Sequence, residues 1–201
     1  MNETPKLRFA TIPGLLALAL TLASCSGGGK GEPPLKGASV GGPFTLTDQN
    51  GRPATDRDFA GRYRIMYFGF THCPDICPTD LAVLGQALRR FEKSDPARAA
   101  RVVPIFVSVD PERDTPAVLK EYVQAFHPRL VGLTGTKAQL ADMVRRYGAY
   151  SEKGEARAGG GYDVNHSRIA ELIGPAGEPI ILLPYDKGAD AVAAELDRWV
   201  E

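Results

Sequence analysis

Along the chain, short runs of nearly continuous apolar residues alternate with longer stretches whose apolar residues recur at helical spacing. A run that is apolar at almost every position is typical of a buried strand, and Tyr63 to Phe70 is the clearest example. Near the start of the pattern, Asp48-Gln49-Asn50-Gly51 supplies hairpin turn chemistry after an alternating segment. Pro104 indicates an edge or a bulge in its strand. Strands are predicted at residues 44–47, 63–70, 101–109, 166–173 and 179–183.

The segments between these strands have the spacing of amphipathic helices. The first helix is expected to begin at Thr79 or Asp80, either of which can cap it, because the preceding prolines delay helix entry. Thr115-Pro116 opens the second helix, with proline near its first position. Helices are predicted at residues 79–91, 115–126, 136–147 and 189–200.

The predicted elements follow the order β-β-α-β-α-α-β-β-α, which fits an α/β domain with one central mixed sheet flanked by helices. A strand that leads into a cysteine motif and a helix, with a closing β-β-α unit, is the thioredoxin-like arrangement. The turn at residues 48–51 adds an N-terminal hairpin to it. We therefore predict a thioredoxin-like domain over residues 43–201.

Residues 1–24 have the features of an export signal. Lys6 and Arg8 precede an apolar stretch, Phe9 to Ala23, that is shorter than the roughly 20 residues a membrane span needs. Leu22-Ala23-Ser24-Cys25 resembles the lipobox of bacterial lipoproteins, in which the cysteine is acylated and becomes the first mature residue. The alternatives are an uncleaved anchor, or an ordinary signal with an incidental cysteine.

The segment 25–42 is rich in Gly, Ser and Pro, a composition typical of a flexible tether. Acylation of Cys25 would attach this tether to a membrane through an N-terminal lipid. We therefore expect an exported, membrane-anchored protein that faces the periplasm or another extracytoplasmic space.

Charge and cysteine content narrow the function classes. The 24 Lys and Arg residues balance 24 Asp and Glu residues, so the chain lacks the basic footprint of a nucleic-acid-binding protein. If Cys25 is acylated, Cys73 and Cys77 are the thiols that remain of the 3 cysteines. Two cysteines cannot form a disulfide-dense scaffold, and residues 43–201 are long enough to bury a core without one. The pair is therefore expected to be functional.

The chemistry concentrates in residues 70–78, FTHCPDICP. Cys73 and Cys77 lie four positions apart, so both sulfurs reach one metal ion or each other. Soft thiolates select Cu(I) or zinc over magnesium or calcium. The helix that follows is expected to lower the thiol pKa, which favours metal binding and redox exchange. The alternative is an inert structural disulfide.

A metal site at this motif needs a further ligand, and the chain offers 3 histidines. His166 is preferred because it begins the predicted strand at 166–173, whose entry loop faces the cysteine turn in a thioredoxin-like sheet. The alternative for His166 is a surface histidine with ordinary partners. His72 is either a ligand itself or, as the neighbour of Cys73, a group that tunes the pKa of that thiol, and His127 is expected to cap the end of a helix.

The motif FGFTHCPDICPT, the segment VDPERDTP at 109–116 and the histidine before ELIGPAG together closely resemble the Sco (SenC/PrrC) family over about residues 40–200. The resemblance implies a thioredoxin-like fold with an added hairpin and insertions. It also implies that Cys73, Cys77 and His166 bind one copper ion per chain, as Cu(I), Cu(II) or both. The implied function is a metallochaperone that helps assemble the binuclear copper centre of cytochrome c oxidase subunit II.

The resemblance makes the oxidase subunit the expected partner, and a copper-donating periplasmic protein is a second one. The chain departs from the family at Asn165, where members usually carry Asp before the histidine. An aspartate there could hydrogen-bond to the second nitrogen of the imidazole, whereas the amide supplies no charge. Asn165→Asp is therefore expected to tighten Cu(II) binding more than Cu(I) binding.

The alternative function is a membrane-tethered thiol-disulfide oxidoreductase that acts on the oxidase subunit, with Cys73 as nucleophile and Cys77 as resolving thiol. Such enzymes carry a proline before the strand that faces the cysteines, and no proline occurs between Pro128 and Pro175. His166 occupies that neighbourhood, which favours a metallochaperone over an enzyme. In either case, the metal-free cysteines are expected to form a disulfide in an oxidising compartment.

Other segments near the motif have two interpretations or a structural one. Asp110 to Pro116 follows a strand at its carboxyl end, where α/β proteins place their sites. It is either a capped turn with a local ion pair or a charged rim that docks the oxidase. Gly159-Gly160-Gly161 is expected to form a mobile loop that lets His166 swing onto the metal. Met66 and Met143 are expected to lie in the core.

Overall fold

The structure is a computed structural model that describes residue 1, residues 31–156 and residues 160–201. The predicted signal segment beyond its first residue, and Cys25, lie outside the described residues. Within the described part of the chain, no helix has both the length and the apolar character that crossing a membrane requires. Glu32–Glu201 forms one folded unit.

Strands of the described chain form a 7-stranded sheet and a 2-stranded sheet. In chain order they are β1 (Thr45–Asp48), β2 (Pro53–Thr55), β3 (Tyr63–Gly69), β4 (Val102–Ser108), β5 (Val131–Thr134), β6 (Ser151–Ala156), β7 (Tyr162–His166), β8 (Ala170–Ile173) and β9 (Pro179–Leu182). The larger sheet has the order β2-β1-β5-β4-β3-β8-β9. Strands β3, β4 and β5 are parallel and the remaining pairs are antiparallel, so the sheet is mixed as predicted.

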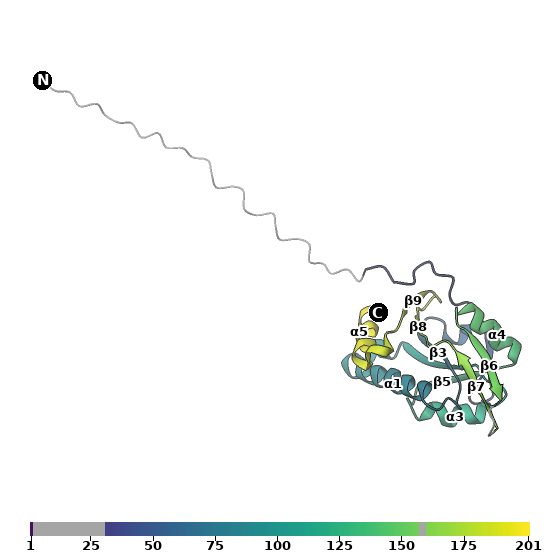
Figure 1. The fold of residues 1–201 in the computed structure, drawn as a ribbon. Coiled ribbons are helices and arrows are strands. Elements are labelled where there is room, and N and C mark those ends of the chain that lie inside the picture. The colour runs from purple at the N-terminus through teal and green to yellow at the C-terminus, as the bar shows by residue number, and fades with distance from the viewer. Residues whose placement is uncertain (2–30, 157–159) are drawn as a thin grey trace. The chain divides into compact units, whose positions relative to one another are not determined.

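Helices cover both faces of this sheet (Figure 1). They are α1 (Ile76–Ser94), α2 (Pro96–Ala99), α3 (Pro116–Gln124), α4 (Lys137–Arg146) and α5 (Ala189–Trp199), with 3₁₀ turns at Asp56–Phe59 and Tyr185–Lys187. Because successive side chains of a strand point to opposite faces, Ile65 and Tyr67 of β3 pack with α1, α3 and α5, whereas Met66 and Phe68 pack with α4. Met66 and Met143 are buried, as predicted.

Two predicted boundaries are wrong, and both lie next to the cysteine motif. α1 begins at Ile76 rather than at Thr79 or Asp80. Pro78 is accommodated because the N–H groups of the first helical turn have no partner within the helix. Of the strand predicted at 166–173, residues 170–173 form β8, which pairs with β3, whereas His166 is the last residue of β7, which pairs with β6 and was otherwise not predicted.

The sequence pattern also missed three strands. β6 has the sequence SEKGEA, which lacks the apolar alternation of a half-buried strand, and it pairs with β7 as a hairpin outside the main sheet. β5 is a strand of 4 residues and β2 of 3, both too short to give a periodic signal. The predicted N-terminal hairpin is confirmed, because β1 pairs with β2 across the turn at Asp48.

Pro104 lies in an interior strand, so the prediction of an edge strand or bulge at this position is wrong. β4 pairs with β3 in regular register through Pro104, which is opposite Ile65. β5 joins β4 on the other side only from Ile105 onward. At Pro104 the strand therefore has one hydrogen-bonded neighbour, which lets a residue without an N–H fit there.

Part of the segment predicted as a tether contacts the domain. The Leu35 N–H donates to the Ile180 carbonyl at 3.0 Å, and the Gly41 N–H donates to the Arg146 carbonyl at 2.9 Å. These bonds join the segment to β9 and to the end of α4. The packed unit therefore includes residues that precede the predicted domain boundary at Pro43.

Burial of Glu171 on β8 leads to a prediction about pH and stability. Glu171 is 2% exposed and its Oε2 atom has no hydrogen-bond partner among the described residues. Burial raises the pKa of its carboxyl to about 8. The unfolded chain ionises near the usual value, so the free energy of unfolding should fall as pH rises from about 4.5 to about 8.

Glu171→Gln should remove this loss, because the amide does not ionise. We expect the variant to gain on the order of 4 kcal/mol over the parent between pH 5 and pH 9. Urea denaturation at both pH values measures the difference. A gap between the two proteins that does not grow with pH would show that Glu171 ionises normally in the fold.

Candidate metal centre

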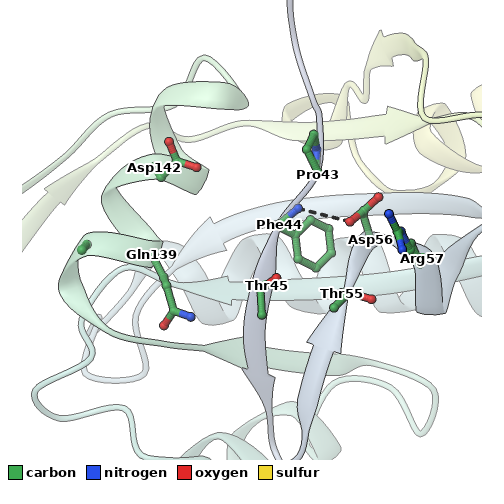
Figure 2. Close-up of a pocket in the computed structure, with 9 residues that line it drawn as sticks. Pro43, Phe44, Thr45, Thr55, Asp56, Arg57, Gln139 and Asp142 are labelled. Carbon is green, nitrogen blue, oxygen red and sulfur yellow. Dashed lines mark hydrogen bonds between the residues drawn. The ribbon is translucent and has the colours of Figure 1, made fainter.

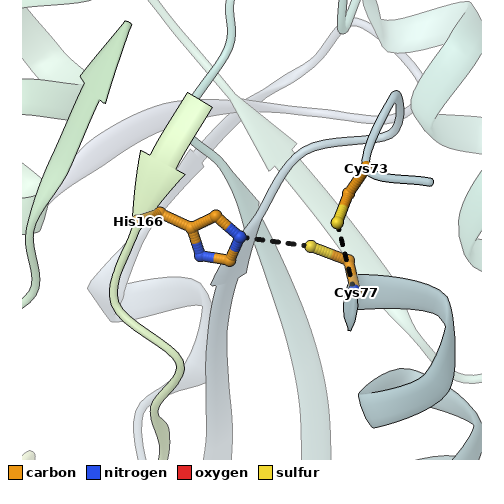
Figure 3. A group of neighbouring side chains, drawn as sticks. All are labelled: Cys73, Cys77 and His166. Carbon is orange, nitrogen blue, oxygen red and sulfur yellow. Dashed lines mark hydrogen bonds between the residues drawn. The ribbon is translucent and has the colours of Figure 1, made fainter. Parts of the chain in front are cut away.

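Two thiols and one imidazole meet at the carboxyl end of β3. The ligand atoms of Cys73, Cys77 and His166 all lie within 4.8 Å of one another. Cys77 Sγ is 3.4 Å from His166 Nε2, and Cys73 Sγ accepts a hydrogen bond from the Cys77 N–H at 3.3 Å (Figure 3). The structure thus brings together the three residues that the sequence singled out, from segments 89 positions apart.

Local structure explains why both sulfurs face the same point. Cys73 lies in the turn after β3, where its N–H donates to the Phe70 carbonyl at 3.3 Å. Cys77 lies in the first turn of α1, and its sulfur packs against Gly69 of β3. A Cβ atom at position 69 would lie 2.9 Å from that sulfur, closer than real contacts allow. Glycine at 69 therefore makes room for the buried thiol.

His166 presents its Nε2 lone pair to the cysteines. Its Nδ1 atom lies 2.9 Å from the Ser167 carbonyl oxygen, which can only accept, so Nδ1 carries the proton. Burial lowers the pKa of His166, which keeps the ring neutral at pH 7. The ring also meets Phe70 edge to face, with centroids 5.7 Å apart. The imidazole is thus neutral, oriented and in the tautomer that binds a metal through Nε2.

The two thiols differ in environment, and one prediction about them is wrong. Cys77 is fully buried whereas Cys73 is partly exposed. The helix terminus was expected to lower the thiol pKa, but burial outweighs it and raises the pKa of Cys77 to about 12. The Cys77 thiol is therefore protonated at neutral pH, and a metal that binds there must displace its proton.

This difference predicts selective alkylation of the metal-free, reduced domain. In single-thiol variants, Cys73 (in Cys77→Ser) should react with iodoacetamide at least about 10-fold faster than Cys77 (in Cys73→Ser), because the reagent needs an accessible thiolate. The Cys77 rate should still be rising at pH 9, given its raised pKa. In urea the two rates should converge. Equal rates in the folded variants would contradict the burial of Cys77.

Asp114 organises the loop that carries Cys73. Its buried carboxylate accepts from the Thr71 N–H at 3.0 Å, the Thr71 hydroxyl at 2.6 Å and the Ser108 hydroxyl at 2.6 Å. These bonds join the end of β4 to the turn after β3. Thr115 caps α3, since its hydroxyl accepts from the Val118 N–H at 3.4 Å. The capped turn predicted for this segment is confirmed.

The same segment holds the hairpin that ends at His166. Arg113 pairs with Asp110 at 2.5 Å, lies 3.7 Å over the Tyr162 ring and donates to the Tyr162 carbonyl at 3.0 Å. The Tyr162 hydroxyl donates to Asp110 at 2.6 Å. Sequence reasoning found the local ion pair but missed Tyr162, because nothing in the pattern of residues 151–166 predicted the hairpin.

The other two histidines lie outside the cluster. His72 is half-exposed, with Nδ1 3.1 Å from the Thr71 hydroxyl and 3.7 Å from Asp114. His127 is buried, accepts from the Arg129 N–H at 3.2 Å and has Nε2 3.4 Å from Glu92. The His127 backbone N–H donates to the Val123 carbonyl of α3 at 3.4 Å, so His127 does bond to the end of this helix, through its backbone, whereas its ring joins the loop to Glu92 of α1.

Two expectations about the chain near His166 also change. Asn165 is exposed and faces the opposite side of β7 from His166, whose Nδ1 is already bonded to Ser167. A carboxylate at 165 therefore has no free imidazole nitrogen to bind, and the expected effect of Asn165→Asp loses its geometric basis. Of the predicted mobile loop, Gly159 lies outside the described residues, and a swing of His166 stays a prediction.

A pocket of about 630 Å³ lies away from the thiol cluster, between the β1–β2 hairpin and α4 (Figure 2). Two carboxylates line it, but both have partners. Asp56 accepts from the Phe44 N–H at 3.3 Å, and Asp142 pairs with Arg145 and Arg146. This pocket has no cysteine or histidine in its lining, so the thiol cluster is the better candidate for a metal site.

Comparison with known proteins supports the fold and places the chain in a family. Protein SCO2, mitochondrial, from Saccharomyces cerevisiae is 40% identical over 167 residues, which cover 81% of this chain and 54% of the yeast protein. The chain spans about half the length of such curated relatives. The structure of Bradyrhizobium japonicum ScoI with copper bound has 39% identity and a TM-score of 0.72, over 80% of this chain and 99% of that one.

The predicted fold is confirmed by a more distant match. The thioredoxin domain of a thiol-disulfide oxidoreductase from Bacteroides vulgatus superposes with a TM-score of 0.55 at 16% identity, over 81% of this chain and 96% of that one. The domain is therefore thioredoxin-like. The family model described as SCO1/SenC matches residues 32–201, which are nearly all of the folded unit. The chain belongs to the SCO1/SenC family.

Proposed function

We propose that this protein is a copper metallochaperone that binds one copper ion through Cys73, Cys77 and His166. It delivers the ion to the binuclear centre of cytochrome c oxidase subunit II. The observation that carries this function is the convergence of two thiols and a neutral imidazole within 4.8 Å. Family membership supports it, and so does the copper-bound structure of the similar ScoI protein.

The donor set fits copper better than other common metals. Two thiolates and an imidazole are soft or borderline ligands, which exclude magnesium and calcium. Zinc in structural sites takes four protein ligands, and in the described part of the chain this cluster has three. The Phe70 ring packs edge to face against the imidazole. Three such ligands suit Cu(I).

Anaerobic titration of the reduced domain tests the proposal. Native mass spectrometry should show one copper per chain at saturation, and the Cys73→Ser, Cys77→Ser and His166→Ala variants should each bind less tightly. Copper bound at full strength by the double cysteine variant would refute the site.

Delivery to the oxidase is tested with the metal-free soluble domain of subunit II. Native mass spectrometry should show copper moving from the copper-loaded protein to subunit II, and the Cys77→Ser protein mixed with the same amount of copper should load subunit II no faster than free copper does. Equal rates for both proteins would contradict delivery through this site.

One observation favours a second candidate function, thiol-disulfide exchange with the oxidase subunit. Cys73 is partly exposed, so a disulfide of a partner protein can reach its sulfur, and the Cys77 N–H donates to that sulfur at 3.3 Å. Cys73 would attack a disulfide of the partner, and Cys77 would resolve the mixed disulfide. His166→Ala separates the roles, because reductant activity would survive the change whereas copper delivery would not.

Membrane anchoring through Cys25 belongs to the proposal as well. The supporting observation is the lipobox-like Leu22-Ala23-Ser24-Cys25 after the apolar segment. Cells that express the full chain with a labelled fatty acid should incorporate label, and Cys25→Ala should prevent it. Unchanged labelling of the variant would reject Cys25 as the acylated residue.

A further inference from the structure

A buried carboxylate links the helix that carries Cys77 to the segment that carries His166. Asp80 lies on α1, one turn after Cys77, and its side chain is 4% exposed. Its Oδ1 accepts from Arg168 Nη2 at 2.8 Å, and its Oδ2 accepts from Arg168 Nε at 3.3 Å. The Tyr67 hydroxyl also donates to Oδ2, at 2.9 Å. Arg168 therefore binds Asp80 through two atoms of its guanidinium group.

Arg168 sits at the centre of a short connection with no regular secondary structure. Residues 167–169 join β7 to β8. The backbone of Arg168 is held as well, because its carbonyl accepts from the Tyr185 hydroxyl at 2.5 Å. The side chain and the backbone of Arg168 are thus both held by hydrogen bonds. Arg168 lies two positions after the imidazole ligand.

Apart from the 3.4 Å contact between His166 Nε2 and Cys77 Sγ itself, the other bonds of this region lead away from α1. Ser167 exchanges hydrogen bonds with Tyr150 at the base of the hairpin, at 2.9 and 2.8 Å. Tyr162 is held by Arg113, in the loop after β4. Neither set of bonds fixes the distance between His166 and the helix that carries Cys77. The Asp80–Arg168 pair spans that gap.

We propose that the Asp80–Arg168 pair positions His166 Nε2 against Cys77 Sγ and so sets how tightly the site holds Cu(II) relative to Cu(I). The inference rests on the proposed copper-binding function. Cu(I) is satisfied mainly by the two thiolates, which come from α1 and the turn before it. Cu(II) depends more on a nitrogen donor at the right place, so a displaced imidazole costs Cu(II) affinity first.

Arg168 is the residue to change, because its side chain is 49% exposed whereas Asp80 is buried and its loss endangers folding. Arg168→Gln removes the charge and the paired donors, and Arg168→Lys keeps the charge without the fork. Arg90→Gln is a matched control, since Arg90 pairs with Asp190 at 2.7 Å and is 47% exposed. It lies far along α1 from the site.

Competition titrations of each variant should separate the two oxidation states. We expect Arg168→Gln to lower Cu(II) affinity by about 10- to 100-fold and Cu(I) affinity by less than about 3-fold, as changes behind a metal ligand do. Arg168→Lys should lose an intermediate amount of Cu(II) affinity, and Arg90→Gln should bind both oxidation states as tightly as the parent does. The nitrogen hyperfine coupling of His166 in the EPR spectrum of the Cu(II) form should weaken in Arg168→Gln.

Two further measurements test positioning directly. In the metal-free reduced protein, amide hydrogens of residues 166–170 should exchange faster in Arg168→Gln than in the parent. In the His166→Ala background, Arg168→Gln should cause no additional loss of Cu(II) affinity, because its effect passes through the imidazole.

Unchanged Cu(II) affinity and unchanged exchange at 166–170 in Arg168→Gln would overturn the inference. So would an equal loss for Cu(I) and Cu(II), or a full additional loss in the His166→Ala background. These results differ from failure of the proposed function, in which the parent protein itself would bind no copper through its thiols.

Discussion

Cys77→Ser should lower the affinity of the reduced domain for Cu(I) by at least about 100-fold. Sites of four protein ligands bind structural zinc with about 10–16 kcal/mol, so one ligand of a small site contributes about 3 kcal/mol, and every 1.4 kcal/mol is tenfold. The serine hydroxyl is a hard donor that Cu(I) does not favour. Cys77 also faces both other ligands, at 3.3 and 3.4 Å through its N–H and sulfur.

Competition with a chromophoric Cu(I) chelator under anaerobic conditions measures this loss. His72→Ala is the matched control, because His72 adjoins Cys73 in sequence but its ring is half-exposed and bonded to Thr71. We expect that control to bind Cu(I) as the parent does. A Cys77→Ser protein that competes for Cu(I) as well as the parent does would show that the thiol cluster is not the copper site.

Asp114→Asn should destabilise the domain by about 3 kcal/mol. The carboxylate is fully buried and accepts three hydrogen bonds, from Ser108 and from two groups of Thr71. Bonds to a charged acceptor contribute about 1.5–3 kcal/mol each, and an amide offers one acceptor oxygen in place of two. The variant therefore loses at least one bond and places an N–H₂ group against a donor.

Urea denaturation measures the change in the free energy of unfolding. Asp142→Asn is the control, since Asp142 pairs with Arg145 and Arg146 on the exposed side of α4 and should cost less than about 1 kcal/mol. The turn with Cys73 should also loosen in Asp114→Asn, so Cu(I) affinity should fall. Equal unfolding midpoints for the two variants would show that the network at Asp114 does not stabilise the fold.

The sequence supports the main elements and the metal ligands because their signals are local. The apolar run from Tyr63 to Phe70 predicts a central strand, and β3 is buried at every position. The cysteine spacing and the family resemblance to residues around His166 predict a three-ligand cluster, and the three ligand atoms do meet. These inferences need little knowledge of what surrounds each residue.

What the sequence could not predict depends on burial and on distant partners. The pKa of Cys77 is raised because its sulfur is deeply buried. This effect is larger than the lowering expected from the helix N-terminus, which is the effect that the sequence motif predicts. Asp80 looks like a helix cap in sequence, yet it binds Arg168 and Tyr67 from two other segments. The hairpin that ends at His166 has few apolar residues, so its sequence does not show the alternation typical of a strand. It is stabilised instead by Arg113, from a distant segment.

Copper K-edge X-ray absorption of the anaerobic, Cu(I)-loaded domain tests the central claim most directly, because it counts the donor atoms around the metal. We predict a first shell of two sulfurs and one imidazole nitrogen in the parent protein. The nitrogen should disappear in His166→Ala, and one sulfur should disappear in Cys77→Ser. A shell of oxygen and nitrogen alone, or a nitrogen that persists in His166→Ala, would contradict the assignment of copper to Cys73, Cys77 and His166.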